Sequence, residues 1–215
     1  MIVSTRLLAR FVCICNSVVL LYIYIPIFVL FFYCSMEKIQ VKDRTFRMYM
    51  PEVEIQKCVK AVADRISKDY RNRKPILCPV LTGSYLFVAD LTRYIEFDAE
   101  VSFVRYSSYD GMSSTGKVKK NLGFPEKCKG RDVIIVEDIV DSGLSMRYMI
   151  DELKKLGPAS IAVCTFFYKP GNFKENFKID YVGKEIPNDF IVGYGLDYDG
   201  VGRTYRDVYI VDDNE

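Results

Sequence analysis

The chain has 215 residues, of which 50% are hydrophobic and 27% charged, enough for one globular domain with a substantial core. The net charge is only +2 and basic residues alternate with acidic ones, so nucleic acid is not expected as a partner. Because histidine is absent, Ser-His-Asp triads, Cys-His dyads and histidine-ligated zinc or iron sites are excluded. Acid–base chemistry must therefore use carboxylates, lysine or tyrosine.

The cysteines indicate a reducing compartment. Their number, seven, is odd, and no Cys-x-x-Cys pair occurs. Free thiols in a cytoplasmic protein are the plainer interpretation. The seven are Cys13, Cys15, Cys34, Cys58, Cys78, Cys128 and Cys164.

Residues 1–35 form an apolar leader whose only charges are Arg6 and Arg10. The run 11–34 is long enough to span a bilayer, and it is too long for a signal peptide and lacks a small-residue cleavage site. One interpretation is a membrane anchor, so a membrane is expected as a partner only if the leader is genuine. The interpretation that we favour is translated upstream sequence, because the pattern of an ordinary soluble domain begins directly at Met36.

Residues 36–215 are then the working domain. Two of the 30 basic residues lie in the leader, so 28 basic residues balance the 28 acidic ones. The working domain is electrically neutral.

In the first half of this domain, apolar residues at helical spacing predict a helix over 55–70. A buried strand over 75–81 and a second helix over 85–95 follow. An alternating strand is predicted at 100–106, and the Ser/Gly/Asp-rich stretch 107–116 indicates a mobile loop.

In the second half, the β-branched run 133–136 predicts a strand, and apolar spacing predicts a helix over 146–156 that ends at Gly157-Pro158. Strands and helices that alternate in this way indicate an α/β fold with a mostly parallel sheet covered by helices. Further strands are expected at 161–168, 181–186, 190–194 and 208–211.

Three carboxylates, Glu137, Asp138 and Asp141, follow the predicted strand 133–136. In open α/β sheets, ligands bind beyond the carboxyl ends of the strands. Glu137 and Asp138 can accept hydrogen bonds from two sugar hydroxyls or face a hydrated magnesium ion. The alternative is an ordinary strand end with a capped helix, but a cap does not require three acids.

Small residues follow the carboxylates at the start of the predicted helix. Ser142, Gly143 and Ser145, together with the first backbone N–H groups of that helix, can hold a phosphate at the positive end of the helix dipole.

The whole segment strongly resembles the phosphoribosyl pyrophosphate motif of type I phosphoribosyltransferases. The resemblance covers about 50–212 and is greatest to the hypoxanthine-guanine phosphoribosyltransferases. It implies a type I phosphoribosyltransferase fold, a twisted parallel sheet flanked by helices with a small hood formed by both chain ends. It also implies that the adjacent acids bind the ribose hydroxyls, that the loop binds the 5-phosphate, and that Asp141 takes the proton at purine N7.

Leu81, Thr82 and Gly83 resemble the family's pyrophosphate-binding loop, in which a non-proline cis peptide directs backbone N–H groups at the ligand. Thr82 stands where many members have lysine, so one positive charge on pyrophosphate is absent here. By itself this motif is also compatible with a simple turn from strand to helix.

Ser108 and Tyr109 resemble the family's flap, which closes over the reacting centre and excludes water. On composition alone this Gly/Ser-rich stretch could equally be an ordinary loop.

The resemblance also assigns a purine site. Lys169 fits the lysine that selects a 6-oxo group, because an ammonium donates hydrogen bonds and accepts none. Phe190 is expected to stack on the purine, and the backbone carbonyls of Ile191 and Asp197 to meet the base edge. Arg203 is expected on pyrophosphate, with Arg206 as a weaker competitor. The magnesium cofactor is expected on Glu137, Asp138 and Asp197.

The expected substrates are phosphoribosyl pyrophosphate and a 6-oxopurine base, with hypoxanthine, guanine and xanthine left unranked, and the expected assembly is a homo-oligomer. One alternative is a regulator of the same fold that senses phosphoribosyl pyrophosphate without catalysis. Lys169 and Phe190 retain a base site, and 36–73 contains no evident helix-turn-helix, so an enzyme is favoured. A second alternative is a membrane-tethered protein.

Overall fold

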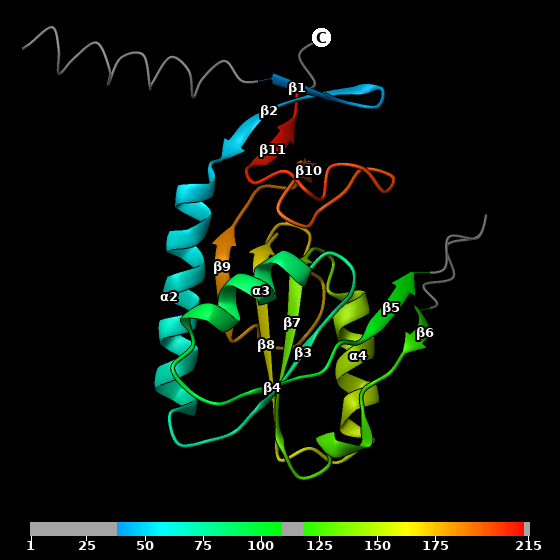
Figure 1. Cartoon of the computed structure of the whole chain (residues 1–215). Helices are drawn as coiled ribbons and strands as arrows, with labels where there is room; N and C mark the ends of the chain where they lie inside the picture. The colour runs from blue at the N-terminus through cyan, green and yellow to red at the C-terminus, as the bar shows by residue number, and fades with distance from the viewer. Residues whose placement is uncertain (1–37, 109–117, 213–215) are drawn as a thin grey trace, which may run out of the picture.

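The computed structural model describes residues 38–108 and 118–212. The apolar leader and Tyr109 therefore lie outside the described residues. Within the described part, a central sheet has helices on both faces and a second, smaller sheet above one end (Figure 1). This arrangement confirms the predicted type I phosphoribosyltransferase fold and its hood. No helix in the described ranges is both long and apolar enough to cross a membrane.

The secondary-structure elements follow the predicted alternation of strands and helices. The helices are α2 (Glu52–Tyr70), α3 (Tyr85–Tyr94), α4 (Leu144–Lys154) and the 3-10 turn η1 (Glu126–Cys128). The strands are β1 (Lys38–Val41), β2 (Arg44–Met50), β3 (Ile76–Pro79), β4 (Glu100–Val101), β5 (Arg105–Ser108), β6 (Val118–Leu122), β7 (Asp132–Val140), β8 (Ser160–Tyr168), β9 (Tyr181–Glu185), β10 (Ile191–Val192) and β11 (Val208–Val211).

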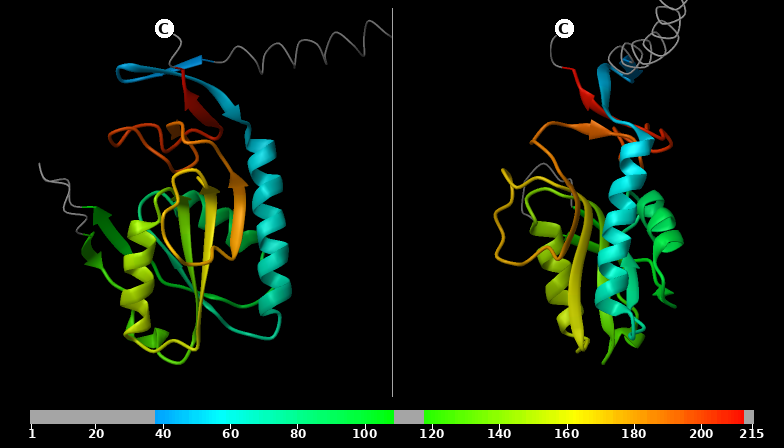
Figure 2. Two further views of the ribbon diagram at one scale, coloured as in Figure 1. Left: turned by 180° about the vertical axis from the view of Figure 1, so that it is seen from behind. Right: turned by 90° about the vertical axis from the view of Figure 1, so that its left-hand side faces the viewer.

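The central sheet has the order β4-β3-β7-β8-β9, and every neighbouring pair in it is parallel. Side chains of adjacent residues in a strand point to opposite faces of the sheet. Because the central strands contain consecutive apolar residues, both faces of this sheet are apolar. Leu77 and Ile134 pack with α2 and α3, whereas Ile76 and Val133 pack with α4. Figure 2 shows these two helical layers from behind and from the side.

The hood sheet has the order β1-β2-β11-β10, so it joins the start of the described chain to its end. All its pairs are antiparallel. The hood lies beyond the carboxyl ends of β8 and β9 (Figure 1). It is tied to the core by Asp207, whose carboxylate accepts the backbone N–H of Glu52 at 2.7 Å and so caps α2.

Some details differ from the predicted elements. The strand expected at 100–106 is divided, because the chain leaves β3 after the bridge between Val80 and Val104 and pairs with β6 instead. Ser107 and Ser108, expected in a loop, belong to β5. Only Ile191 and Val192 of the expected strand 190–194 are in a strand. The hood strands β1 and β2 and the hairpin strand β6 were not individually predicted.

Candidate active site

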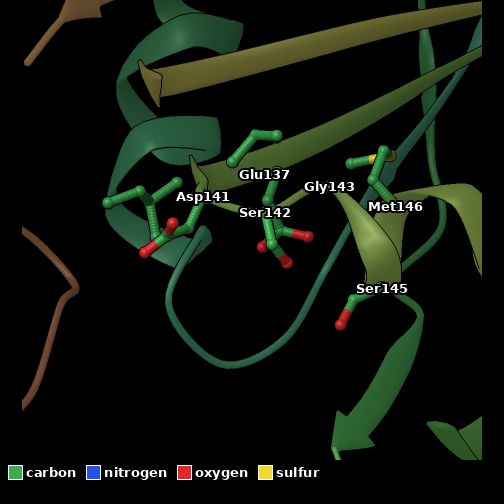
Figure 3. A pocket seen from close by; sticks show the side chains of 8 residues that line it. Glu137, Asp141, Ser142, Gly143, Ser145 and Met146 are labelled. Carbon is green, nitrogen blue, oxygen red and sulfur yellow. The ribbon is translucent and has the colours of Figure 1, made fainter. Parts of the chain in front are cut away.

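A pocket of about 140 Å³ lies where β7 ends and α4 begins (Figure 3). Strand β7 is longer than predicted, and it carries Glu137 and Asp138 as part of the strand rather than in a loop after it. Five of the predicted site residues line the pocket. The complete lining is Glu137, Ile139, Val140, Asp141, Ser142, Gly143, Ser145 and Met146.

Gly143 makes the turn from β7 into α4. Its φ of 85° is in the left-handed region, and an added Cβ would lie 2.7 Å from Cε2 of Phe173. The backbone carbonyl of Ser142 accepts the N–H of Lys174 at 3.1 Å. The loop between β8 and β9 therefore holds this turn from outside. The first N–H groups of α4 point toward the pocket end of the helix, as phosphate binding requires.

Glu137 and Asp138 are partly buried acids whose pKa values are both raised, chiefly by burial. The charge of Asp138 raises the pKa of Glu137 further, and a hydrogen bond between the two side chains also favours protonated Glu137. The Asp138 carboxylate accepts the backbone N–H of Ile139 at 2.8 Å. The charges of these two adjacent acids are unfavourable together, and hydroxyl donors or a divalent cation bound there would stabilise them.

The loop after β3 packs directly on Asp138. The peptide bond between Leu81 and Thr82 is cis, as the resemblance implied. A Cβ added to Gly83 would lie 1.4 Å from Oδ2 of Asp138, so only glycine fits here. Thr82 is exposed, whereas the buried Ser84 donates its hydroxyl to the carbonyl of Val80 at 2.6 Å. The loop is fixed from both sides.

A second glycine brings the hood onto this loop. Gly195, with a φ of 97°, would place a Cβ 2.1 Å from the carbonyl oxygen of Gly83. Arg203 donates to the carbonyl of Gly195 at 2.6 Å and pairs with the Asp197 carboxylate at 2.6 Å. The second oxygen of Asp197 accepts the N–H of Gly200 at 2.6 Å. The structure thus brings together the two segments expected on pyrophosphate, the loop 81–83 and the hood loop that carries Arg203.

The expected purine residues lie in two places. Lys169 is only 6% exposed, and its Nζ lies 3.4 Å from Oδ2 of Asp141 and 3.5 Å from the carbonyl of Asn188. Phe190 is 39% exposed, and Ile191 is buried beside it in the hood. Neither hood residue lines the pocket at the start of α4, so the expected base and phosphate sites are adjacent but separate.

Sequence reasoning missed three residues of this site. Gly195 and Phe173 determine how closely the loops approach, and Asn188 supplies a carbonyl to Lys169. The two glycines at 193 and 195, separated by a single residue, were a sequence signal for a close backbone contact. No signal in the sequence pointed to Phe173 or Asn188. Ser108 lies at the end of β5, but its side chain is outside the description, so the expected flap stays a prediction.

No cluster of three or more acid, cysteine or histidine side chains able to enclose a metal occurs in 38–108 or 118–212. Magnesium, however, is commonly bound by one or two carboxylates together with substrate oxygens and water. The paired acids Glu137 and Asp138 fit that mode. Each oxygen of Asp197 has one protein partner and keeps a lone pair that could face a metal.

Comparison with known proteins agrees with this geometry. The sequence model of the phosphoribosyl transferase domain matches residues 52–199. The hypoxanthine phosphoribosyltransferase of Buchnera aphidicola is 41% identical over 165 residues, which are 75% of this chain and 92% of that protein. The hypoxanthine-guanine phosphoribosyltransferase of Aquifex aeolicus is 35% identical over 176 residues, 81% of this chain and 99% of that protein.

The chain belongs to the hypoxanthine-guanine phosphoribosyltransferase family. A crystal structure of a family member from Bacillus anthracis superimposes with a TM-score of 0.74 at 35% identity, over 80% of this chain and 100% of that one. The predicted resemblance is therefore confirmed. The matched domain 52–199 does not include Arg203 or the hood strands β1, β2 and β11.

We expect Gly195→Ala to weaken both folding and activity, because its Cβ would meet a backbone oxygen that cannot rotate away. The control is Gly130→Ala, which has a φ of 67° and open space around it. The control should lose about 1–2 kcal/mol of unfolding free energy from backbone strain alone. Gly195→Ala should lose roughly 1–3 kcal/mol more through overpacking. Urea unfolding and turnover measure both, and equal losses in the two variants would contradict the contact.

We expect Glu137→Gln to raise the melting temperature of the ligand-free, metal-free protein at pH 8. The pKa of Glu137 is higher in the folded than in the unfolded chain, so its ionisation lowers stability as pH rises from the unfolded toward the folded value. The advantage of Glu137→Gln should therefore shrink as the pH falls toward about 4.3, the ordinary glutamate value. Glu185→Gln, which removes an exposed carboxylate, is the control. A lower melting temperature for Glu137→Gln at pH 8 would refute the assignment.

Proposed function

We propose that this protein is a purine-salvage enzyme that joins hypoxanthine or guanine to the ribose of phosphoribosyl pyrophosphate, giving IMP or GMP and pyrophosphate. One observation carries the proposal: the predicted phosphoribosyl pyrophosphate motif and the predicted pyrophosphate loop meet where Gly83 lies against Asp138. The family relatives, whose names describe this activity, support it. A bond from ribose C1 to pyrophosphate oxygen breaks, and a bond from C1 to purine nitrogen forms.

The phosphate half of the substrate is assigned to the core. The start of α4, with Ser142, Gly143 and Ser145, would bind the 5-phosphate through N–H and hydroxyl donors. Glu137 and Asp138 would accept from the ribose hydroxyls. Pyrophosphate would contact the backbone of Leu81, Thr82 and Gly83 and the guanidinium of Arg203.

The base half is assigned to Lys169, Asp141 and the hood. The carboxylate of Asp141 and the ammonium of Lys169 are 3.4 Å apart, and a 6-oxopurine presents O6 and N7 side by side on one edge. Lys169 would donate to O6, and Asp141 would accept the proton from N7 as the bond to ribose forms. Phe190 would stack on the ring, with the carbonyls of Ile191 and Asp197 at the C2 edge.

Magnesium is the cofactor that this donor set fits. Glu137, Asp138 and Asp197 would hold it with substrate oxygens, and it would neutralise charge on the departing pyrophosphate. Arg203 pairs with Asp197 and donates to the carbonyl of Gly195, and the remaining N–H groups of its guanidinium would bind pyrophosphate. The proposal has four further parts. A flap with Ser108 and Tyr109 would close over the site, and the enzyme would be cytoplasmic and homo-oligomeric. The chain would divide into a leader, 1–35, and an enzyme domain, 36–215.

A base-by-base assay with magnesium tests the activity and the role of Lys169 together. The wild type should turn over hypoxanthine and guanine but not adenine. Lys169→Ala should raise the KM for hypoxanthine roughly tenfold to a hundredfold, because a charged hydrogen bond contributes about 1.5–3 kcal/mol. The KM for phosphoribosyl pyrophosphate should change little.

Lys178→Ala is the matched control, because this exposed lysine on the same loop pairs with Asp180 away from the site. No turnover of any purine by the wild type would refute the proposed function. A rise in the KM for phosphoribosyl pyrophosphate alone would instead assign Lys169 to the other substrate.

We expect Asp141→Asn to lower turnover about 100-fold to 10,000-fold by removing the proton acceptor. The protein should fold normally, because the Asp141 side chain is 48% exposed. Asp151→Asn, which changes an exposed acid of α4 that pairs with Arg147, should leave turnover intact. Near-normal turnover of Asp141→Asn with a lowered melting temperature would show that Asp141 is structural.

A further inference from the structure

The turn between β1 and β2 contacts the loop that follows the proposed purine strand. Nζ of Lys42 donates to the carbonyl of Asp199 at 2.9 Å and lies 3.3 Å from its carboxylate. The hydroxyl of Tyr198 donates to Oδ1 of Asp43 at 2.9 Å. In both Figure 1 and Figure 2 this turn lies over the loop beyond β10. Segments more than a hundred residues apart in the chain are thus joined by three polar contacts.

The same turn also covers the ring of Tyr198. Cζ of Arg44 lies 5.4 Å from the ring centroid, and Nζ of Lys42 lies 5.9 Å from it. Cations at such distances are attracted to an aromatic face. Asp43 therefore holds the hydroxyl of Tyr198, and Lys42 and Arg44 lie over its ring. These three residues are consecutive in the β1–β2 hairpin.

Tyr198 in turn packs on Phe190, the ring proposed to stack on the purine. The two ring centroids are 5.7 Å apart and the planes meet at 75°, an edge-to-face contact. Phe46 of β2 completes the cluster, 6.3 Å from Phe190 and 6.4 Å from Tyr198. Phe46 is fully buried, whereas Phe190 remains 39% exposed. The β1–β2 hairpin thus supplies both the base of this cluster and the residues that hold Tyr198.

Local bonds fix the backbone of the loop but not the Tyr198 side chain. Tyr198 and Val201 exchange two backbone hydrogen bonds, at 2.8 and 3.1 Å, and Asp197 accepts the N–H of Gly200. The side chain of Tyr198 receives its polar and cationic contacts from the hairpin. A change in the hairpin can therefore move the rings without unfolding the loop.

We propose that Tyr198 is a positioning residue for purine binding, held by Lys42, Asp43 and Arg44 and acting through the orientation of Phe190. The proposal rests on the proposed function, because it assumes that Phe190 stacks on the base. Its consequence is that a hairpin outside the matched domain 52–199 determines affinity for the base. Affinity for phosphoribosyl pyrophosphate depends mainly on β7, α4 and the loop after β3.

A purely structural role would lower stability without separating the two substrates. The chain contains a matched control at the opposite side of the fold. The hydroxyl of Tyr181 donates to Asp69 at 2.7 Å, and Cζ of Arg65 lies 5.3 Å from its ring, so the local chemistry is the same. Tyr181→Phe removes an equivalent hydrogen bond between β9 and α2, far from Phe190.

The experiment measures KM for hypoxanthine, KM for phosphoribosyl pyrophosphate, kcat and melting temperature of the full chain. Tyr198→Phe keeps the ring and should raise the KM for hypoxanthine about twofold to tenfold, the usual effect of one hydrogen bond. Asp43→Ala should do the same, and Asp43→Asn, which keeps an acceptor, should restore most of the loss. Combining Tyr198→Phe with Asp43→Ala should add little, because both remove one bond.

In all these variants the KM for phosphoribosyl pyrophosphate should stay within about twofold of the wild-type value. In the control Tyr181→Phe, the KM values for both substrates should stay within about twofold of the wild type. Tyr198→Leu, which also removes the edge-to-face ring, should raise the KM for hypoxanthine roughly tenfold or more. An unchanged KM for hypoxanthine in Tyr198→Phe and Asp43→Ala, with an active wild type, would overturn the inference. Equal rises in both KM values would overturn it as well. An inactive wild type would instead refute the proposed function.

Discussion

The arrangement of the site depends on one steric constraint: Gly83 and Gly195 each lie where an added Cβ would meet a neighbouring segment. Oδ2 of Asp138 occupies the place of the missing Cβ of Gly83, and the missing Cβ of Gly195 would meet the carbonyl oxygen of Gly83. The loop after β3, the end of β7 and the loop of the hood are therefore in direct contact. Their relative positions are set by backbone and carboxylate atoms, which adjust less easily than long side chains. A ligand that touches all three segments finds them already assembled.

This close packing explains why the acids at the end of β7 are costly to the ligand-free protein. Both Glu137 and Asp138 are partly buried, and their pKa values are raised because burial disfavours the charged forms. The charge of Arg203 lowers the pKa of Asp138, but burial outweighs it. Hydroxyl donors or a cation would compensate these acids better than the ligand-free protein does.

The sequence was sufficient for the parts of the structure that repeat a regular pattern. The run of β-branched residues before Glu137 and the helical spacing after Gly143 predicted β7 and α4, because burial on both faces leaves a continuous apolar signal. The hood was anticipated only through family resemblance. Strand β1 is short and β2 does not alternate strictly between polar and apolar residues, and the buried side of β2 is explained only by its pairing with β11 from the other end of the chain.

The contacts within the site were less accessible to sequence reasoning, because they join distant segments. The sequence could not predict that Lys169 is buried beside Asp141, because an isolated lysine is usually exposed. Phe173 against Gly143 is a similar case. The cis peptide bond between Leu81 and Thr82 was predicted from the family resemblance and not from composition. Motifs predicted which residues take part, and only the fold determined how closely they approach.

The two halves of the site differ in what supports them, and this difference has a consequence for function. The proposed phosphate half is built on the central sheet and on a helix terminus, and buried residues of β3, β7 and α4 beside it belong to the two core clusters. The base half is built on a four-stranded hood whose exposed ring, Phe190, is supported by Phe46 and Tyr198. Arg203 pairs with Asp197 of the hood loop and donates to the carbonyl of Gly195, the residue that packs on Gly83. The proposed base half therefore depends on the β1–β2 hairpin for the placement of its rings, whereas the proposed phosphate half does not.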